Sequence, residues 1–144
     1  MLFGKRKRVV KRILIVEDEP LTAFDNEVML GDLGYEVVGT LDNFEDAIAR
    51  LESEQVDLIL SDYRLSGERT GLDLARAAKS HEVPIFFATG HKLPDESVQL
   101  AIGCIAKPYN ERTLKLALEA VDRHLRGETV KPPKGVELYV GTEG

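Results

Sequence analysis

Short apolar runs alternate along the chain with stretches in which apolar residues recur at helical spacing. The runs are too short for helices and are rich in β-branched and aromatic residues, which is typical of strands. Several stay apolar on consecutive residues, as strands covered on both faces do in a parallel sheet. The five predicted strands span residues 13–16, 35–39, 57–61, 84–88 and 104–106.

Five helices are predicted, one after each strand. The first begins at Pro20, a residue suited to the first helical position, and Gly34 ends it. Its apolar positions at helical spacing are Leu21, Phe24, Val28 and Leu33. The others begin after Asp42 or Asn43, after Thr70 and Gly71, around Pro94, and after Asn110. We expect the fifth helix to bury Leu114, Leu118, Val121 and Leu125 and to stop at Gly127.

Strand and helix thus alternate five times. This order predicts an α/β fold in which a five-stranded parallel sheet has helices on both faces, a three-layer sandwich joined by right-handed crossovers. A chain of 144 residues is long enough for one such domain with its own core. Ligands in these folds bind at the carboxyl ends of the strands, where the strand order reverses.

Composition narrows the class of protein. With 43% hydrophobic and 31% charged residues, the chain has the composition of a globular domain. Its single cysteine excludes a disulfide scaffold, and one cysteine with three histidines makes a zinc site unexpected. No apolar run approaches the length of a membrane span, and no apolar stretch follows the basic N-terminus, so we expect no membrane span, no signal peptide and a cytoplasmic protein.

Charge is unevenly distributed. The first 12 residues carry six cations and no acid, which leaves a net charge of −12 on the rest of the chain. We expect residues 1–11 to form a basic arm, 12–126 a domain and 127–144 a tail or linker, in which 136–140 could add a strand. Such an arm is usually a solvated segment, and contact with phospholipid, nucleic acid or an acidic partner is the alternative. We expect no direct nucleic-acid binding.

Polar residues that carry chemistry follow the predicted strands. They are Glu17, Asp18 and Glu19 after the first, Asp62 after the third, Thr89 after the fourth and Lys107 after the fifth. If the sheet is parallel, these side chains converge on one rim. A cluster of carboxylate oxygens with room for water suits Mg²⁺, which would neutralise the carboxylates and bind a phosphoryl oxygen.

Four segments together resemble the signature of response-regulator receiver domains. They are ILIVEDEP, LILSDYRLSG, FFATG and AKPY, in this order and at the ends of the right strands. The resemblance covers about residues 12–126 and implies a flavodoxin-like receiver fold. Any one segment would be weak, but the four in order are specific.

The resemblance implies a role for each residue of the rim. Asp62 would accept a phosphoryl group from a histidine kinase or a histidine phosphotransfer protein. Glu17 and Asp18 would hold Mg²⁺ together with Asp62 and the backbone carbonyl of Arg64. Beyond these, Thr89 would be the switch hydroxyl and Lys107 the cation that contacts the phosphoryl group.

Each rim residue also has an ordinary structural interpretation. Asp18 or Glu19 could cap the first helix, and Asp62 could be a turn residue. Thr89 could be a β-branched residue before a turn and Lys107 a surface lysine. Their joint occurrence at one rim favours the phosphoacceptor site.

Two features depart from the common receiver pattern. Cys104 stands three positions before Lys107, where most receivers carry an aromatic residue that moves with the switch hydroxyl. The stretch PIFFATGH resembles the "FAT GUY" group of single-domain response regulators, which is associated with stress-response phosphorelays. His91 stands where that group often has tyrosine, and Tyr109 is expected to pack near the rim.

The predicted function is that of a single-domain response regulator. Only 18 residues follow the fifth helix, so we expect output through protein–protein interaction or onward phosphotransfer, with a downstream protein still to be identified. The face made by the fourth helix, fifth strand and fifth helix is the expected output surface. We expect no enzyme beyond self-phosphorylation and self-dephosphorylation, because the chain lacks a GxxxxGK[ST] loop and a second acid two residues after Asp62. Cys104 motivates the alternative, a pseudo-receiver that binds partners without phosphorylation.

Overall fold

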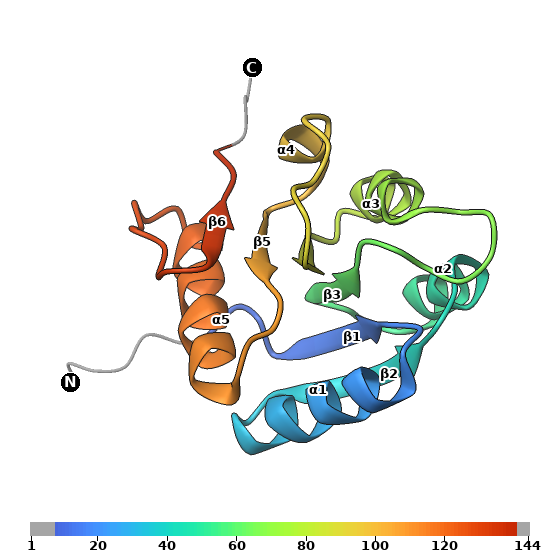
Figure 1. Ribbon diagram of the computed structural model, residues 1–144, viewed down its shortest axis with the longest axis horizontal. Helices are drawn as coiled ribbons and strands as arrows, with labels where there is room; N and C mark the ends of the chain where they lie inside the picture. The colour runs from blue at the N-terminus through green and yellow to red at the C-terminus, as the bar shows by residue number, and fades with distance from the viewer. Residues whose placement is uncertain (1–7, 141–144) are drawn as a thin grey trace.

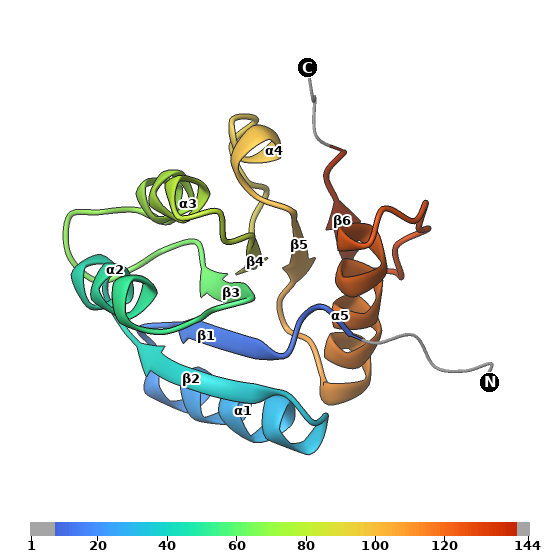
Figure 2. The ribbon, with the colours of Figure 1, turned by 180° about the vertical axis from the view of Figure 1, so that it is seen from behind.

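A mixed sheet with strand order β2-β1-β3-β4-β5-β6 forms the centre of the molecule (Figures 1 and 2). The structure is a computed structural model and describes residues 8–140. The strands are β1 (Arg12–Val16), β2 (Glu36–Leu41), β3 (Leu58–Asp62), β4 (Ile85–Thr89), β5 (Gly103–Ala106) and β6 (Val136–Leu138). β1 to β5 are parallel, and β6 pairs antiparallel with β5. The order reverses between β1 and β3, and this switch point is where such folds bind ligands.

The helices cover both faces of the sheet (Figures 1 and 2). They are α1 (Pro20–Asp32), α2 (Phe44–Ser53), α3 (Gly71–Ser80), α4 (Ser97–Leu100) and α5 (Glu111–Leu125). Side chains of Asn43, Thr70 and Asn110 accept hydrogen bonds from the first turns of α2, α3 and α5. Of the two candidates for the cap of α2, Asn43 takes it, and α3 begins at Gly71, one residue earlier than predicted. The α/β sandwich expected from the alternation is confirmed.

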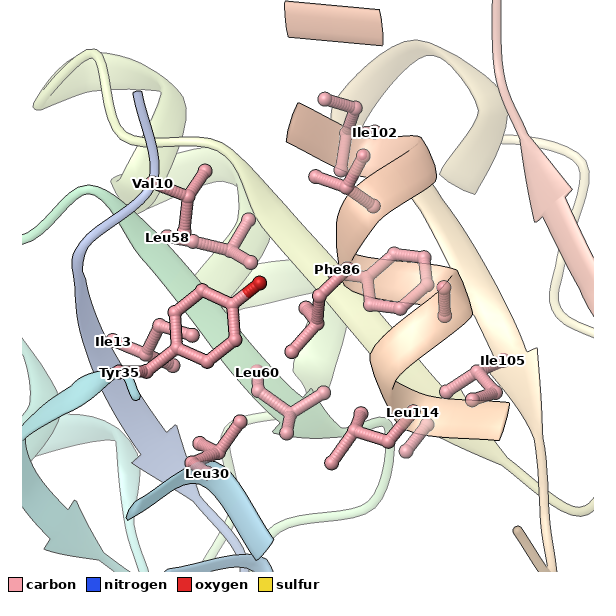
Figure 3. Close-up of a cluster of buried hydrophobic side chains, with 14 of the residues drawn as sticks. Val10, Ile13, Leu30, Tyr35, Leu58, Leu60, Phe86, Ile102, Ile105 and Leu114 are labelled. Atoms are coloured by element: carbon pink, nitrogen blue, oxygen red, sulfur yellow. The ribbon is translucent and has the colours of Figure 1, made fainter. Parts of the chain in front are cut away.

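Alternate residues of each strand enter two separate cores. On one face Ile13, Leu58 and Phe86 pack against α1 and α5, and Figure 3 shows these side chains converging with Leu30 and Leu114. On the other face, α2 and α3 pack against the next residue of each of these strands, Leu14, Ile59 and Phe87. The consecutive apolar residues of the strands are therefore explained by burial on both sides of the sheet.

The strand boundaries differ from the prediction by one or two residues, and the fourth helix begins later than expected. The second strand begins at Glu36 because the Tyr35 amide donates to the Leu30 carbonyl and so belongs to the end of α1. The fourth helix begins at Ser97 instead of near Pro94, because residues 95 and 96 form a turn in which the Ser97 amide donates to the Pro94 carbonyl.

Two predicted apolar faces also need correction. The first helix is present, but Leu21, Phe24 and Val28 are exposed, at 73%, 61% and 45%. The face of α1 that packs on the sheet carries Ala23, Asn26 and Leu30. In α5 the expected stripe is buried except for its last member, Leu125, which is 39% exposed in the final turn. Three of the four predicted positions of this helix therefore lie on the surface, and the fourth, Leu33, is partly buried and packs against the core.

The sheet has one strand more than the five predicted. β6 lies in the segment expected to be a tail or linker, and it covers the edge of β5. The backbone of β6 approaches so closely that a Cβ atom added to Gly103 would lie 2.1 Å from the Glu137 carbonyl oxygen. Only glycine fits at this position of β5. The expected output face therefore carries an additional strand.

The segment before β1 is also attached to the domain. Val10 is buried in the core, and the amides of Val9 and Val10 both donate to the carboxylate of Asp122 on α5. The Arg8 guanidinium lies 4.3 Å from the centre of the Tyr35 ring. Arg12 forms ion pairs with Glu36 and Glu54, at 2.7 and 2.8 Å. The other cations among the first 12 residues are Lys11, whose backbone amide donates to Asp57, and Lys5, Arg6 and Lys7, which lie outside the described residues.

Candidate functional site

Three carboxylates lie together at the carboxyl ends of β1 and β3. One ligand oxygen from each of Glu17, Asp18 and Asp62 lies within 4.8 Å of the others. Glu17 and Asp18 directly follow β1, and Asp62 is the last residue of β3. Because β1 and β3 are parallel neighbours at the switch point of the sheet, their ends bring these side chains to the same place.

Lys107 joins this cluster from the end of β5. Its Nζ lies 3.3 Å from Glu17 Oε1 and 3.5 Å from Asp62 Oδ1. The Lys107 amide donates to the Thr89 carbonyl, which extends the β4–β5 pairing by one residue and aims the side chain across the sheet end. The peptide between Lys107 and Pro108 is cis. The ammonium is the one positive charge within ion-pair distance of these acids among the described residues.

Glu17 is the most enclosed of the acids, with only 4% of its surface exposed. Burial raises the pKa of its carboxyl above the ordinary value, and the nearby charge of Asp62 adds to that rise. A hydrogen bond from the Glu19 amide and the Lys107 ammonium oppose the rise in pKa. A cation placed among the three carboxylates would remove much of this electrostatic cost.

Asp18 is exposed, so it faces the open side of the cluster. The Ser66 hydroxyl, from the loop after β3, donates to Asp18 Oδ2 at 3.3 Å. Ser66 was not singled out as a site residue from the sequence, and its place in a polar loop gave no signal for this contact. The carbonyl of Arg64 lies in the same loop, and its predicted role as a metal ligand stays a prediction.

The loop after β3 is held by Gly71 at the start of α3. The Gly71 amide donates to the Tyr63 carbonyl at 2.9 Å. A Cβ atom at Gly71 would lie 2.5 Å from the same carbonyl oxygen and 3.0 Å from the Phe87 ring. The loop that follows Asp62 can therefore approach α3 only because residue 71 has no side chain.

Glu19 does not join the acids. Its side chain accepts from the amide and the hydroxyl of Thr22, at 2.8 and 2.9 Å, and so caps α1. These hydrogen bonds lower the pKa of the Glu19 carboxyl. Of the two candidates for this cap, Glu19 takes it, which leaves Asp18 free to face the cluster.

Thr89 is the last residue of β4 and is 9% exposed. Its hydroxyl donates to the His91 carbonyl at 3.0 Å and accepts from the His91 amide at 3.1 Å. The hydroxyl is thus engaged within the β4–α4 loop. Turning it toward Asp62 would require breaking both hydrogen bonds.

Two tyrosines lie near the rim. The Tyr109 hydroxyl donates to Asn26 Oδ1 of α1 at 2.8 Å, and burial raises the pKa of this phenol. Tyr109 therefore packs, as expected, and fixes the α1 side of the site. The Tyr139 hydroxyl donates to Cys104 Sγ at 3.4 Å. No sequence signal connected Tyr139 with the site, because the contact crosses 35 residues.

The donor set fits Mg²⁺. Three carboxylates supply only oxygen, one of them faces open space, and the nearby ammonium balances part of their charge. A hard divalent cation that keeps several waters is suited to such a set, whereas a softer metal would favour nitrogen or sulfur ligands. Glu17, Asp18 and Asp62 are the residues that would hold it.

Comparison with known families agrees with this geometry. The family model described as the response regulator receiver domain matches residues 13–119. This chain belongs to the response regulator receiver domain family. Receiver domains are signalling modules of two-component systems, and they bind Mg²⁺ at an acidic pocket.

Individual relatives are similar to different extents. The phyllosphere-induced regulator PhyR of Methylorubrum extorquens is 38% identical over 102 residues, which cover 67% of this receiver chain and 38% of PhyR. The chain likewise spans 52% of the length of two Pseudomonas aeruginosa regulators. The structure of PhyR from Brucella abortus matches with a TM-score of 0.69 at 29% identity, covering 84% of this chain and 51% of that one.

A receiver domain solved with metal is also similar. The receiver domain of the sensor histidine kinase PA1611 from Pseudomonas aeruginosa has magnesium coordinated in its active-site cleft. It matches with a TM-score of 0.68 at 28% identity and covers 83% of this chain and 99% of that one. Within residues 8–140 the receiver has no helix long and apolar enough to cross a membrane.

Proposed function

We propose that this receiver takes a phosphoryl group on Asp62 with the help of Mg²⁺ and signals by a change in protein binding or by onward phosphotransfer. The observation that carries the proposal is the position of the Lys107 ammonium, 3.3 Å from Glu17 and 3.5 Å from Asp62, beside a third carboxylate. Phosphoryl transfer requires positioning and charge neutralisation more than covalent chemistry from other groups.

Each residue has a defined part in the transfer. A carboxylate oxygen of Asp62 attacks the phosphorus of a phosphohistidine, forming an O–P bond as the N–P bond breaks and the imidazole leaves. Glu17, Asp18 and Asp62, with the Arg64 carbonyl, would hold Mg²⁺, which would supply positive charge for the phosphoryl oxygens. The Lys107 ammonium binds another of these oxygens. The Thr89 hydroxyl leaves His91 and donates to the phosphoryl group, which makes Thr89 the switch.

The phosphoryl donor would be a histidine kinase or a histidine phosphotransfer protein. Leu21, Phe24 and Val28 lie on one exposed face of α1, whose first residue follows the acidic cluster. Apolar side chains gathered on a surface mark interaction sites. A partner that brings phosphohistidine to Asp62 would cover this face of α1, which explains why the stripe is not buried in the receiver itself.

Several finer points belong to the same proposal. The FFATG segment supports membership of the FAT GUY group, with a role in a stress-response phosphorelay. Action as a single-domain regulator without enzymatic output remains part of the proposal. The alternative is a pseudo-receiver, favoured by Cys104 in place of the usual aromatic, whose partner binding would not depend on phosphorylation.

Intact mass spectrometry after incubation with acetyl phosphate and Mg²⁺ tests the proposal. We expect the addition of one phosphoryl group to the wild-type receiver and none after Mg²⁺ is chelated. Asp62→Asn removes the acceptor at almost unchanged shape and should abolish the added mass. Wild-type protein that gains no phosphoryl group from acetyl phosphate or a cognate kinase would favour the pseudo-receiver.

A further inference from the structure

The chain after α5 turns back and adds β6 to the free edge of β5 (Figure 1). The Ala106 amide donates to the Gly135 carbonyl and the Tyr139 amide donates to the Ile102 carbonyl, both at 2.8 Å. β6 has only three residues. Short edge strands open at lower free energy than the central strands of a sheet, so β6 can detach while the domain stays folded.

Tyr139, just after β6, is anchored at both ends. Its hydroxyl donates to Cys104 Sγ at 3.4 Å, and its carbonyl lies 3.1 Å from His124 Nε2 of α5. Tyr139 therefore places an aromatic ring beside the β5 position that lacks one in this sequence.

A cavity of about 550 Å³ separates β6 from the β4–α4 loop. Thr89 and His91 line one wall, Val136 and Tyr139 line the other, and Cys104 and Lys107 lie between them. The cavity thus connects the predicted switch hydroxyl with the tyrosine of the added segment. Space of this size gives an aromatic ring room to move.

Two connections link the phosphoacceptor site to this cavity. Thr89 can reach a phosphoryl group on Asp62 only by releasing His91, which changes one wall of the cavity. Lys107, which contacts Asp62, directly follows Ala106, whose amide holds β6 through Gly135. A change at Asp62 therefore acts on both sides of the space next to Tyr139.

We propose that Tyr139 is the aromatic positioning residue of this switch, and that phosphorylation of Asp62 draws its ring toward the space left by Thr89 and loosens β6 from β5. The inference rests on the proposed phosphorylation of Asp62. Filling the vacated space restores packing contacts that an open void would lose. In this proposal the inward shift of the ring pulls the Tyr139 amide from the Ile102 carbonyl, to which it donates at 2.8 Å, and so makes the edge of β5 accessible in the phosphorylated state.

Amide hydrogen exchange resolved by NMR tests this coupling in the full chain. We expect the amides of Tyr139 and Ala106 to exchange faster by on the order of tenfold when acetyl phosphate and Mg²⁺ are present. The Tyr35 amide, bonded to the Leu30 carbonyl at the other side of the sheet, is the internal control and should not change. Intact mass measured on the same samples reports the phosphorylation of Asp62 separately.

Three variants assign the effect to Tyr139. Tyr139→Ala should still gain the phosphoryl group but lose the phosphorylation-dependent change at Ala106. Val140→Ala, on the next residue and 77% exposed, is the matched control and should respond as wild type does. Since Tyr139→Ala could release β6 permanently, Thr89→Val provides the second test: β6 should keep its unphosphorylated protection and lose the response.

The outcomes distinguish the two proposals. Wild-type protein that gains no phosphoryl group overturns both. Phosphorylated wild type with unchanged exchange at Tyr139 and Ala106 overturns the coupling alone and leaves Asp62 as the acceptor. A full exchange response in Tyr139→Ala or in Thr89→Val would contradict the role assigned to Tyr139.

Discussion

The Asp18→Asn substitution should change the stability of the receiver in opposite directions with and without Mg²⁺. The three carboxylates and the Lys107 ammonium leave a formal charge of −2 at the cluster. At a separation of 4.8 Å, two like charges repel by about 0.9 kcal/mol even in a water-like dielectric. The Asp18 carboxylate has two such neighbours, and the Lys107 ammonium offsets part of the repulsion between them. Removing the charge of Asp18 should therefore stabilise the metal-free protein by about 1 kcal/mol.

With Mg²⁺ the sign reverses. At a concentration 100 times its dissociation constant, a ligand stabilises a protein by about 2.7 kcal/mol. Loss of one carboxylate ligand that weakens binding by about tenfold reduces this stabilisation to about 1.4 kcal/mol. For a domain of this size 1 kcal/mol corresponds to about 3 °C in Tm, so Mg²⁺ should raise Tm by about 8 °C in the wild type and about 4 °C in Asp18→Asn.

Thermal unfolding followed by circular dichroism, with chelator and with Mg²⁺, measures both effects. Asp25→Asn removes an exposed carboxylate elsewhere on α1 and is the matched control, expected to respond to Mg²⁺ as the wild type does. A full response of Asp18→Asn to Mg²⁺ would contradict the placement of Asp18 as a metal ligand. A metal-free variant less stable than the wild type would refute the assignment of repulsion to this cluster.

Three further substitutions test other parts of the structure. Lys107→Met should cost about 1–3 kcal/mol without metal, because buried Glu17 loses its cation, and should tighten Mg²⁺ binding, which calorimetric titration measures. Gly103→Ala should cost about 1–3 kcal/mol in urea unfolding and remove protection from β6, since its Cβ collides with that strand. Asp73→Ala should cost about 1 kcal/mol at pH 7, because Asp73 accepts from the Thr70 amide in a capping box. That hydrogen bond lowers the pKa of Asp73 in the folded state. The contribution of the Asp73 carboxylate to stability is therefore present above its unfolded-state pKa and is lost as the pH falls through its folded-state pKa. Urea unfolding at a series of acidic pH values measures this loss.

Features with a local physical cause were predictable from the sequence. The strands were visible because residues such as Ile59 and Phe86 are buried on both faces of a parallel sheet. The helix starts at Asn43 and Asn110 follow from side-chain caps. The rim acids and Lys107 come together because every parallel strand ends at the same edge.

Features that depend on distant contacts were not predictable. The spacing of Phe24 from the neighbouring apolar residues predicts a helix but not which side of the helix packs on the sheet. The buried side carries Asn26, because the Tyr109 hydroxyl donates a hydrogen bond to its side chain. β6 was only an option in the sequence, since its pairing depends on the absence of a side chain at Gly103. The Tyr139–Cys104 contact exists only once that strand is in place.

The central claim is that Asp62 is the residue that accepts a phosphoryl group. The most direct measurement is to treat the phosphorylated receiver with borohydride, which reduces an acyl phosphate to the alcohol, and to locate the modified residue by peptide mass spectrometry. We expect homoserine at position 62 and unmodified Glu17 and Asp18. Modification at another carboxylate, or none after incubation with Mg²⁺ and a competent phosphodonor, would contradict it.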